Sequence, residues 1–459
     1  MVFSSTTFLF LFLPAVLLVY YNPIIKGRAF RNGLLLLSSL LFYGWGEPVF
    51  VFLMIFSIFV TWLCGLHIGH GSGKKVLVVG TVYHVVILFI FKYLTFCASQ
   101  LGLLLNKDFS FIRITLPIGI SFFTFQLMSY LFDVYYGKAN RQKNPFYVGL
   151  YVSLFPQLIA GPIVRYEEVE QEIIERKESF DDVCAGMMRF SCGLGKKILL
   201  SNYMAQIADN CFDYLSQMSV AMAWLGAIAY ALQIYFDFSG YSDMAIGLGR
   251  MFGFHFSENF NYPYIAGSVT DFWRRWHMSL STWFRDYVYI PLGGNRVSKR
   301  RRALNLFTVW LLTGIWHGAN WTFILWGLVY YGFLMLEKQT KLLDKLGKLS
   351  HVYTRMVVLL LWVVFRATSL GSAFAYLGNL FGIGAAGLVD RQFFVYLRST
   401  GLVLLLALIG CGPWVKNLFG KLQDKGLGWI EPVWVTVVFL ASVLQAVSST
   451  YNPFIYFNF

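Results

Sequence analysis

The stretch ALNLFTVWLLTGIWHGANWTFILWGLVYYGFLML, residues 303–336, decides the fold, because it is almost wholly apolar and carries His317 near its centre. Basic residues flank it on both sides, which places both flanks in the cytosol by the positive-inside rule. An arm of about 16 residues rises only about 24 Å, less than the ~30 Å hydrocarbon core of a bilayer. We therefore expect a helical hairpin or broken helix with His317 at or beyond the midplane. A single long tilted helix is the alternative, and it also keeps His317 deep. The flanking basic residues are Arg296, Lys299, Arg300, Arg301, Arg302, Lys338, Lys341, Lys345 and Lys348.

The composition of the whole chain also indicates a membrane protein. Of its 459 residues, 57% are hydrophobic and only 13% are charged, whereas soluble domains carry about 25% charged residues. Because lipid offers no partners to backbone N–H and C=O groups, such apolar runs form helices. We expect an all-α polytopic membrane protein with re-entrant segments, roughly eleven transmembrane helices and a single integral-membrane domain over residues 1–459. Candidate spans lie near residues 3–22, 33–46, 48–68, 76–97, 114–136, 146–164, 184–209, 219–254, 303–336, 352–370, 391–412 and 432–449.

The net charge of +14 comes from Lys and Arg at the ends of apolar segments, where they set membrane topology. No basic-aromatic surface or nucleic-acid-binding module accompanies this charge, so we expect membrane lipid and no nucleic acid as a partner. The first span, residues 3–22, has no convincing cleavage site, and we expect it to be retained. Lys26, Arg28 and Arg31 follow that span, so its N-terminal end is expected outside.

Residues 165–182, RYEEVEQEIIERKESFDD, are far richer in charge than the sequence around them. This pattern is typical of a solvated helix, and we expect a charged cytosolic or interfacial helix that connects two spans.

Six scattered cysteines form no Cys-x-x-Cys pair and no Cys/His cluster with zinc spacing. We therefore expect no metal site and no bound cofactor. The sequence also lacks a Gly-x-Ser-x-Gly elbow, so a covalent serine mechanism is not indicated.

His317 is the first candidate for a catalytic residue. A desolvated imidazole stays neutral, as a general base requires, and an ionisable group at membrane depth marks a functional site. Gly314 and Gly318 permit close helix contact. Asn320 is three residues further on and is expected on the same helical face, where it could orient the ring or donate to an oxyanion. The alternative is a structural histidine bonded to a neighbouring helix.

Residues 270–286 predict an amphipathic helix with two distinct faces. One face is aromatic and is expected in the core or at the membrane interface, and Asp271 is expected to pair with Arg275. The second face would suit an anionic or polarised substrate in a tunnel, although a structural ion-pair network fits it almost as well. The aromatic face comprises Trp273, Trp276, Leu280 and Trp283, and the polar face comprises Arg274, His277, Ser281 and Arg285.

Asp237 and Asp243 stand in the apolar stretch 219–254 and are further candidates for the tunnel. Because they are six residues apart, they do not share a helical face well, which disfavours catalysis by a carboxylate pair. We expect them to be structural partners of Arg274, Arg275 or Arg285.

Several motifs in a fixed order carry a resemblance to a known family. The chain resembles the membrane-bound O-acyltransferases, in the bacterial branch that includes the alginate O-acetylation proteins, with the D-alanyl transfer proteins of teichoic acid as relatives. The resemblance extends along the whole chain. Its motifs are Phe155–Pro162, Phe236–Asp243, Phe272–His277, Tyr289–Asn295, Trp316–Trp321 and Phe365–Ala367.

The resemblance implies a catalytic core over residues 255–336, with two signature positions at His277 and His317 and His317 as the catalytic one. It implies a cytosolic thioester donor such as acetyl-CoA, used as a substrate, and O-acetylation of an exported polysaccharide. A periplasmic or extracellular partner acyltransferase is expected, in a bacterial cytoplasmic (inner) membrane. His317 would remove the proton of the acceptor hydroxyl, while His277, Asn320 or backbone amides would stabilise the oxyanion.

Two other functions stay open at this point. One is D-alanyl transfer from the thioester of an acyl carrier protein to teichoic acid. The other is a flippase or channel for acyl or sugar units, in which the histidines relay protons. Direct transfer and a transient acyl intermediate are both compatible with the residues.

Overall fold

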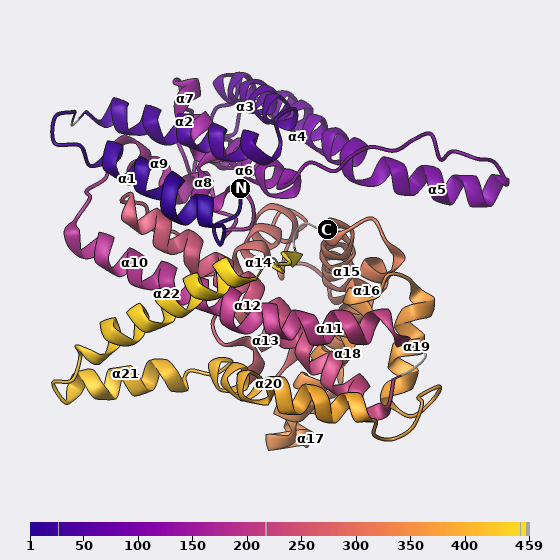
Figure 1. Ribbon diagram of the computed structural model, residues 1–459. Helices are drawn as coiled ribbons and strands as arrows, with labels where there is room; N and C mark the ends of the chain where they lie inside the picture. Colours follow the sequence, from indigo (N-terminus) through magenta and orange to yellow (C-terminus); the bar gives the residue numbers. More distant parts are fainter. Residues whose placement is uncertain (26, 216–217, 450, 456–459) are drawn as a thin grey trace. The chain divides into compact units, whose positions relative to one another are not determined.

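The computed structural model describes residues 1–25, 27–215, 218–449 and 451–455, and helices dominate it (Figure 1). The described ranges contain no named strand, only an isolated bridge between Gly69 and Ser72. The all-α fold class is therefore confirmed. Lys26, one of the expected topology anchors, lies outside the described residues.

The chain divides into two compact units. The first unit consists of residues 1–190 and 242–257, and the second consists of residues 191–241 and 258–459. Helices α10 (Phe180–Gly195) and α12 (Val220–Met251) contribute residues to both units. The single integral-membrane domain expected from the sequence stays a prediction.

The other helices of the first unit precede α10. They are η1 (Phe8–Phe12), α1 (Leu13–Tyr20), α2 (Arg28–Gly46), α3 (Phe50–His67), α4 (Lys74–Leu88), η2 (Phe89–Tyr93), α5 (Leu94–Leu105), α6 (Ile120–Tyr136), α7 (Pro145–Ser153), α8 (Phe155–Leu158) and α9 (Tyr166–Ile174). The expected span 146–164 is thus broken between α7 and α8, where Leu154 leaves the helical conformation and Pro156 starts the next turn. A proline nitrogen has no hydrogen to donate, so it fits the first turn of a helix and not its interior.

The other helices of the second unit are mostly short before α15 and long after it. They are η3 (Lys196–Ser201), α11 (Asn202–Asp213), η5 (Pro263–Ile265), α13 (Val269–Arg275), α14 (Met278–Phe284), η6 (Arg285–Tyr289), α15 (Lys299–His317), α16 (Trp321–Thr340), α17 (Leu342–Leu346), η7 (Gly347–Leu349), α18 (Ser350–Arg366), α19 (Leu370–Leu380), α20 (Arg391–Gly410), α21 (Trp414–Asp424) and α22 (Ile430–Ser448).

Among the described residues, six helical segments are long and apolar enough to cross a membrane. Other expected spans fall on shorter helices or on helices that are interrupted, as in the stretch 303–336. The figure of roughly eleven crossings therefore stays a prediction, while the multi-pass helical character is confirmed. The six segments are Phe50–His67, Lys74–Leu105, Val220–Met251, Leu342–Arg366, Arg391–Gly410 and Ile430–Ser448.

The stretch 303–336 forms a helical hairpin, and Figure 1 shows its two arms, α15 and α16, side by side. The arms approach so closely that a Cβ on Gly314 would lie 2.6 Å from the carbonyl oxygen of Phe323. A Cβ on Gly327 would lie 2.5 Å from the carbonyl oxygen of Trp310. Small residues at such contacts let two helices pack backbone to backbone in a membrane. The hairpin is confirmed and the single tilted helix is wrong.

The charged stretch 165–182 is not one helix, which corrects the expectation from its sequence. Helix α9 ends at Ile174 and α10 begins at Phe180, because side chains of the intervening loop enter the first unit. The guanidinium of Arg176 is buried and donates to the hydroxyl of Tyr20 and the carbonyl of Phe252. Burial would raise the pKa of the Glu178 carboxyl, but hydrogen bonds from Arg28 and Tyr20 and nearby positive charges outweigh it and lower the pKa to about 2.

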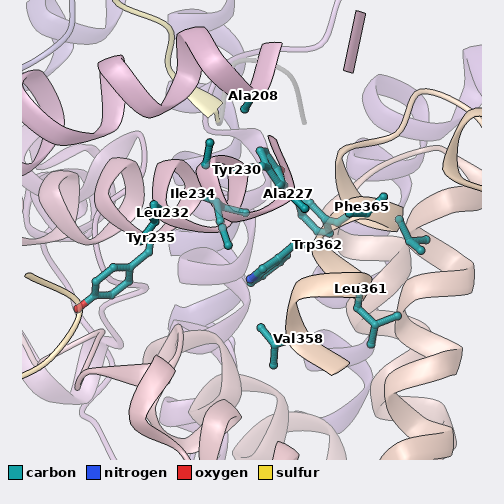
Figure 2. Packing of buried hydrophobic residues seen from close by; sticks show 14 of the residues in the cluster. Ala208, Ala227, Tyr230, Leu232, Ile234, Tyr235, Val358, Leu361, Trp362 and Phe365 are labelled. Atoms are coloured by element: carbon teal, nitrogen blue, oxygen red, sulfur yellow. The ribbon is translucent and has the colours of Figure 1, made fainter. Parts of the chain in front are cut away.

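Aromatic and aliphatic side chains of α11, α12 and α18 pack together in the second unit (Figure 2). Trp362 of α18 is fully buried, and its indole N–H donates to the hydroxyl of Tyr264 over 3.1 Å. That hydroxyl donates in turn to the carbonyl of Ala231 in α12 over 2.6 Å. A buried tryptophan is costly unless its polar atom finds a partner. The chain of bonds therefore fixes α18 against α12.

A buried ion pair connects η3 to α12 and holds residues 451–455 in the second unit. Nζ of Lys197 lies 2.6 Å from Oδ1 of Asp237, and the two side chains are only 3% and 1% exposed. The backbone N–H of Ile455 donates to Oδ2 of Asp237 over 2.8 Å, and Lys197 also donates to the carbonyl of Pro453. We call residues 451–455 the strap. The expected pairing of Asp237 with Arg274, Arg275 or Arg285 is therefore wrong.

The second acidic candidate, Asp243, pairs with Arg189 within the first unit, with Nη2 of the arginine 2.8 Å from Oδ1. Its expected pairing with Arg274, Arg275 or Arg285 is also wrong. The reason is the same in both cases. A carboxylate in an apolar helix pairs with the cation that tertiary packing brings closest, and helical spacing within one stretch does not identify that cation.

The hairpin predicts that both of its outer ends lie on the same side of the membrane. Ser298 precedes α15 and Thr340 ends α16, and both residues are exposed. In a variant without native cysteines, Ser298→Cys and Thr340→Cys are expected to react with a membrane-impermeant thiol reagent from the cytosolic side only. Reaction of the two positions from opposite sides would contradict the hairpin.

The Lys197–Asp237 pair predicts a strong asymmetry between single and double substitutions. Lys197→Met leaves a buried carboxylate unpaired, and we expect the free energy of unfolding to fall by about 3–5 kcal/mol. Adding Asp237→Leu removes the unpaired charge and should recover most of the lost free energy of unfolding. Arg189→Met is the matched control, because its pair with Asp243 is partly exposed and should contribute at most about 1 kcal/mol. Denaturation in detergent measures the free energy of unfolding of the wild type and of the three variants. Equal losses in Lys197→Met and Arg189→Met would refute the asymmetry.

Candidate functional site

His317 is the last residue of α15, and the chain leaves the helix immediately after it. Gly318 has an extended backbone (φ 177°, ψ 162°), and a Cβ at this position would lie 2.4 Å from the ring of Phe323. Helix α16 then begins after Asn320, whose side chain accepts a hydrogen bond from the N–H of Thr322 over 3.1 Å. The last residue of α15 and the capped start of α16 therefore lie together at the tip of the hairpin.

The structure corrects the expected role of Asn320. Because α15 ends at His317, Asn320 does not share a helical face with that residue. Its oxygen caps α16, and its Nδ2 donates to the carbonyl of Thr368 over 2.9 Å. Both ends of the amide are thus engaged in holding the tip of the hairpin. Asn320 fixes the place of His317 through the backbone, and its position as a substrate contact stays a prediction.

Aromatic rings enclose the imidazole of His317, which is 7% exposed. The ring centroid lies 5.0 Å from that of Trp316, 5.1 Å from that of Trp326 and 5.0 Å from that of Phe365. These contacts come from both arms of the hairpin and from α18, which also carries the buried Trp362 of the core in Figure 2. The burial expected from the sequence is confirmed, and it follows from the close approach of α15 to α16.

His277 stands at a break between two short helices, so the continuous helix expected over residues 270–286 is wrong. Helix α13 ends at Arg275, α14 begins at Met278, and His277 has a left-handed backbone (φ 45°, ψ 55°). A loop supplies the partners that the break requires. The N–H of Met278 donates to the carbonyl of Asn259 over 3.0 Å, and the N–H of Asn261 donates to the carbonyl of Arg275 over 2.9 Å.

The polar face expected on that helix does not form, because the break turns its members apart. His277 is 1% exposed, whereas Arg274, Ser281 and Arg285 are exposed. Ser281 donates to the carbonyl of Trp273 over 3.3 Å, and Nε of Arg285 lies 2.7 Å from Oδ1 of the neighbouring Asp286. The structure therefore places His277 in the interior and the other three on the surface. A role for Arg274, Ser281 and Arg285 toward substrate stays a prediction.

The aromatic face is buried as expected, even though the helix is broken. Trp273 packs against Trp326 at 5.4 Å between ring centroids, and Trp276 packs against Trp362 at 4.9 Å. The predicted pair between Asp271 and Arg275 is confirmed at 3.0 Å. Burial depends on the apolar character of these residues, which the sequence displays directly.

The two histidines meet across one indole ring. The Trp316 centroid lies 5.9 Å from that of His277 and 5.0 Å from that of His317. On its other side, the His277 ring makes an edge contact with Phe238 at 4.6 Å. The structure thus brings the two sequence candidates into one buried aromatic enclosure. Such an enclosure excludes water, which strengthens every polar interaction inside it.

Three residues of this enclosure were not identified from the sequence. Trp326 looked like an ordinary apolar position, Phe365 was noted only as part of the motif Phe365–Ala367, and Asn259 was not singled out. Asn259 is fully buried, and its Oδ1 lies 3.2 Å from Nδ1 of His277. The sequence did contain an indication of this, because an asparagine between two phenylalanine-containing segments has no obvious reason to face solvent. Its partner, however, is 18 residues away and is set by the loop.

Across the described residues, no group of three or more His, Cys, Asp or Glu side chains is arranged to hold a metal ion. Aromatic rings lie around both histidines, and the amide of Asn259 contacts His277. A buried imidazole can accept a proton at a bare ring nitrogen, which is the chemistry that this enclosure offers.

Comparisons with known proteins agree with this architecture. A family model described as MBOAT, the membrane-bound O-acyltransferase family, matches residues 41–380. A probable alginate O-acetylase of Pseudomonas putida is 38% identical, and the match covers 100% of both chains. A peptidoglycan O-acetyltransferase of Helicobacter pylori is 32% identical over 100% of this chain and 98% of that protein. A teichoic acid D-alanyltransferase of Bacillus subtilis is 30% identical over 52% of this chain and 65% of that protein.

The family model covers most of the chain, including α15, α16 and both histidines, and two relatives match it from end to end. The D-alanyltransferase is a third relative, and it matches only part of this chain. This multi-pass helical membrane protein is therefore an O-acyltransferase that belongs to the membrane-bound O-acyltransferase family.

Proposed function

We propose that this O-acyltransferase moves an acetyl group from a cytosolic thioester, acetyl-CoA, to a hydroxyl of an exported cell-surface polysaccharide, with His317 as the general base. The observation that carries the proposal is the enclosure at the tip of the hairpin. It buries His317 beside His277, and the flanks of the hairpin are strongly basic. The full-length relatives named as O-acetylases of alginate and of peptidoglycan support an acetyl group and a polysaccharide acceptor.

The proposed reaction needs one general base next to the hydroxyl that receives the acetyl group. His317, neutral because it is buried, takes the hydroxyl proton while the oxygen attacks the thioester carbonyl carbon. The tetrahedral intermediate then collapses, the carbon–sulfur bond breaks, and the thiolate leaves with the proton that His317 returns. The products are the O-acetyl ester and a free thiol. The aromatic walls keep water out, which protects the thioester from hydrolysis.

Residues 255–336 form the catalytic core in this proposal, because they supply both histidines and the hairpin. A position near the midplane lets one base serve a donor from the cytosol and an acceptor from outside. The acceptor at this site is the polysaccharide itself or a periplasmic or extracellular partner acyltransferase that carries the acetyl group onward. The proposed location is the bacterial cytoplasmic membrane, where acetyl-CoA and the outer acceptor are both within reach.

D-alanyl transfer is a second candidate function, because one observation favours it. Teichoic acid D-alanyltransferases of Bacillus subtilis and Streptococcus thermophilus match 52% and 46% of this chain. For this candidate we propose an aminoacyl thioester on a carrier protein as the donor, and the same base and thioester chemistry would apply. The full-length matches to O-acetylases favour the acetyl group.

Replacing the proposed base tests the assignment of His317. His317→Ala should lower the rate of polymer acetylation by about 10²–10⁴-fold, the usual contribution of a general base. The measurement is ester-linked acetate on the cell-surface polymer, with variant abundance and melting temperature matched to the wild type. His277→Ala should have a smaller effect. Normal acetylation by a folded His317→Ala protein would rule out His317 as the base.

The identity of the donor predicts which labelled thioester is consumed. Purified protein in lipid should transfer label from [¹⁴C]acetyl-CoA to a hydroxyl acceptor, and His317→Ala protein should not. A carrier protein charged with labelled D-alanine is the parallel substrate. Transfer from the carrier protein alone would refute acetyl-CoA as the donor and establish D-alanyl transfer in its place.

A further inference from the structure

Asn259 and Ser279 make a group of hydrogen bonds at Nδ1 of His277. The hydroxyl of Ser279 lies 3.4 Å from Nδ1, and Nδ2 of Asn259 is buried with no hydrogen-bond partner among the described residues. Oδ1 of Asn259 lies 3.2 Å from Nδ1 of His277 and 3.2 Å from the backbone nitrogen of Ser279. The hydroxyl of Ser279 donates to the same oxygen over 2.9 Å. Asn259 and His277 are both at most 1% exposed, so the contact between them is buried.

The backbone N–H of Ser279 decides which end of the amide faces His277. A backbone N–H can only donate, so the amide atom that it contacts must be the oxygen. Turning the amide round would place an NH₂ group against that N–H and leave a half-buried N–H without an acceptor, which is costly. An amide oxygen cannot donate a hydrogen bond, so Nδ1 of His277 must carry the hydrogen that joins them.

This arrangement fixes the tautomer of His277. A neutral imidazole has one N–H and one bare nitrogen, so a proton on Nδ1 leaves a lone pair on Nε2. Nε2 is buried, and among the residues that the structure describes it has no hydrogen-bond partner. The left-handed backbone at His277 (φ 45°) is uncommon for residues other than glycine, and such conformations persist where the surrounding structure holds them.

We propose that Asn259 is a positioning residue that holds His277 as its Nδ1–H tautomer, so that Nε2 of His277 accepts a hydrogen bond from a hydroxyl of the acceptor other than the one that His317 deprotonates. A neutral imidazole in this tautomer has no free N–H, and it therefore does not donate to the oxyanion. The contact with the acceptor rests on the proposed function. The tautomer itself rests only on the contacts of Asn259.

Nuclear magnetic resonance on the full chain tests the tautomer directly. The protein is labelled with ¹⁵N-histidine and placed in lipid nanodiscs, and the signals of His277 among the seven histidines are assigned by difference from His277→Gln. The expected spectrum shows a protonated Nδ1 and a bare Nε2 in the wild type. Asn259→Ala should convert His277 to the other tautomer or to a mixture, whereas Asn259→Asp, which keeps an acceptor oxygen, should preserve the Nδ1–H form.

Two variants serve as controls in the same spectra. Ser279→Ala removes a hydroxyl bond to Oδ1 but keeps the backbone N–H that orients the amide, so the tautomer should stay unchanged. Asn379→Ala removes another buried asparagine of the second unit, one that donates to the carbonyl of Leu215, and it should also leave the tautomer unchanged. A protonated Nε2 in the wild type, or an unchanged tautomer in folded Asn259→Ala protein, would overturn the proposal.

Acyl transfer provides a second readout. Asn259→Ala should lower kcat by about 10–100-fold, as the loss of a group that orients a functional histidine does, and Asn259→Asp should recover part of it. Equal loss in Asn259→Ala and Asn259→Asp, with different tautomers, would overturn the link between tautomer and transfer. Retained activity in His317→Ala would refute the proposed base and leave the spectra of His277 as they are, so the two failures are distinguishable.

Discussion

The structure depends on a single constraint, which is that a helix must stop inside apolar sequence at His317. Every helix end leaves backbone groups without partners, and lipid provides none. The protein meets this cost by turning the chain back on itself. Glycines at 314 and 327 bring the two arms into backbone contact, and Asn320 caps the returning helix. The aromatic enclosure, the burial of both histidines and the contact with α18 all follow from that closed hairpin.

The hairpin, the burial of the tryptophans and the pairing of Asp271 with Arg275 were predictable, because each depends on spacing within one short stretch. Charge at the two ends of residues 303–336 and the reach of a helix were enough to predict the hairpin. The break at His277 was not predictable in the same way. The periodicity of residues 270–286 is that of a good helix, and the partners that open it belong to Asn259 and Asn261 in an earlier loop.

The partners of the acidic residues of α12 were likewise not predictable from the local sequence. Asp237 and Asp243 were visible as unusual residues in an apolar helix, but their cations, Lys197 and Arg189, come from η3 and α10. Pairings between distant elements depend on packing that no local pattern encodes. Asn320 illustrates the reverse case, since its position next to His317 suggested a chemical role and the geometry gives it a capping role.

The strap adds a consequence for the order in which the protein matures. Asp237 accepts a hydrogen bond from the backbone N–H of Ile455, which lies 218 positions later in the chain. Lys197 pairs with Asp237 and also donates to the carbonyl of Pro453 in the strap. During synthesis, the helices that bear this acid and this base leave the ribosome long before their last partner exists. The second unit can therefore complete its interior only after residues 451–455 have been made.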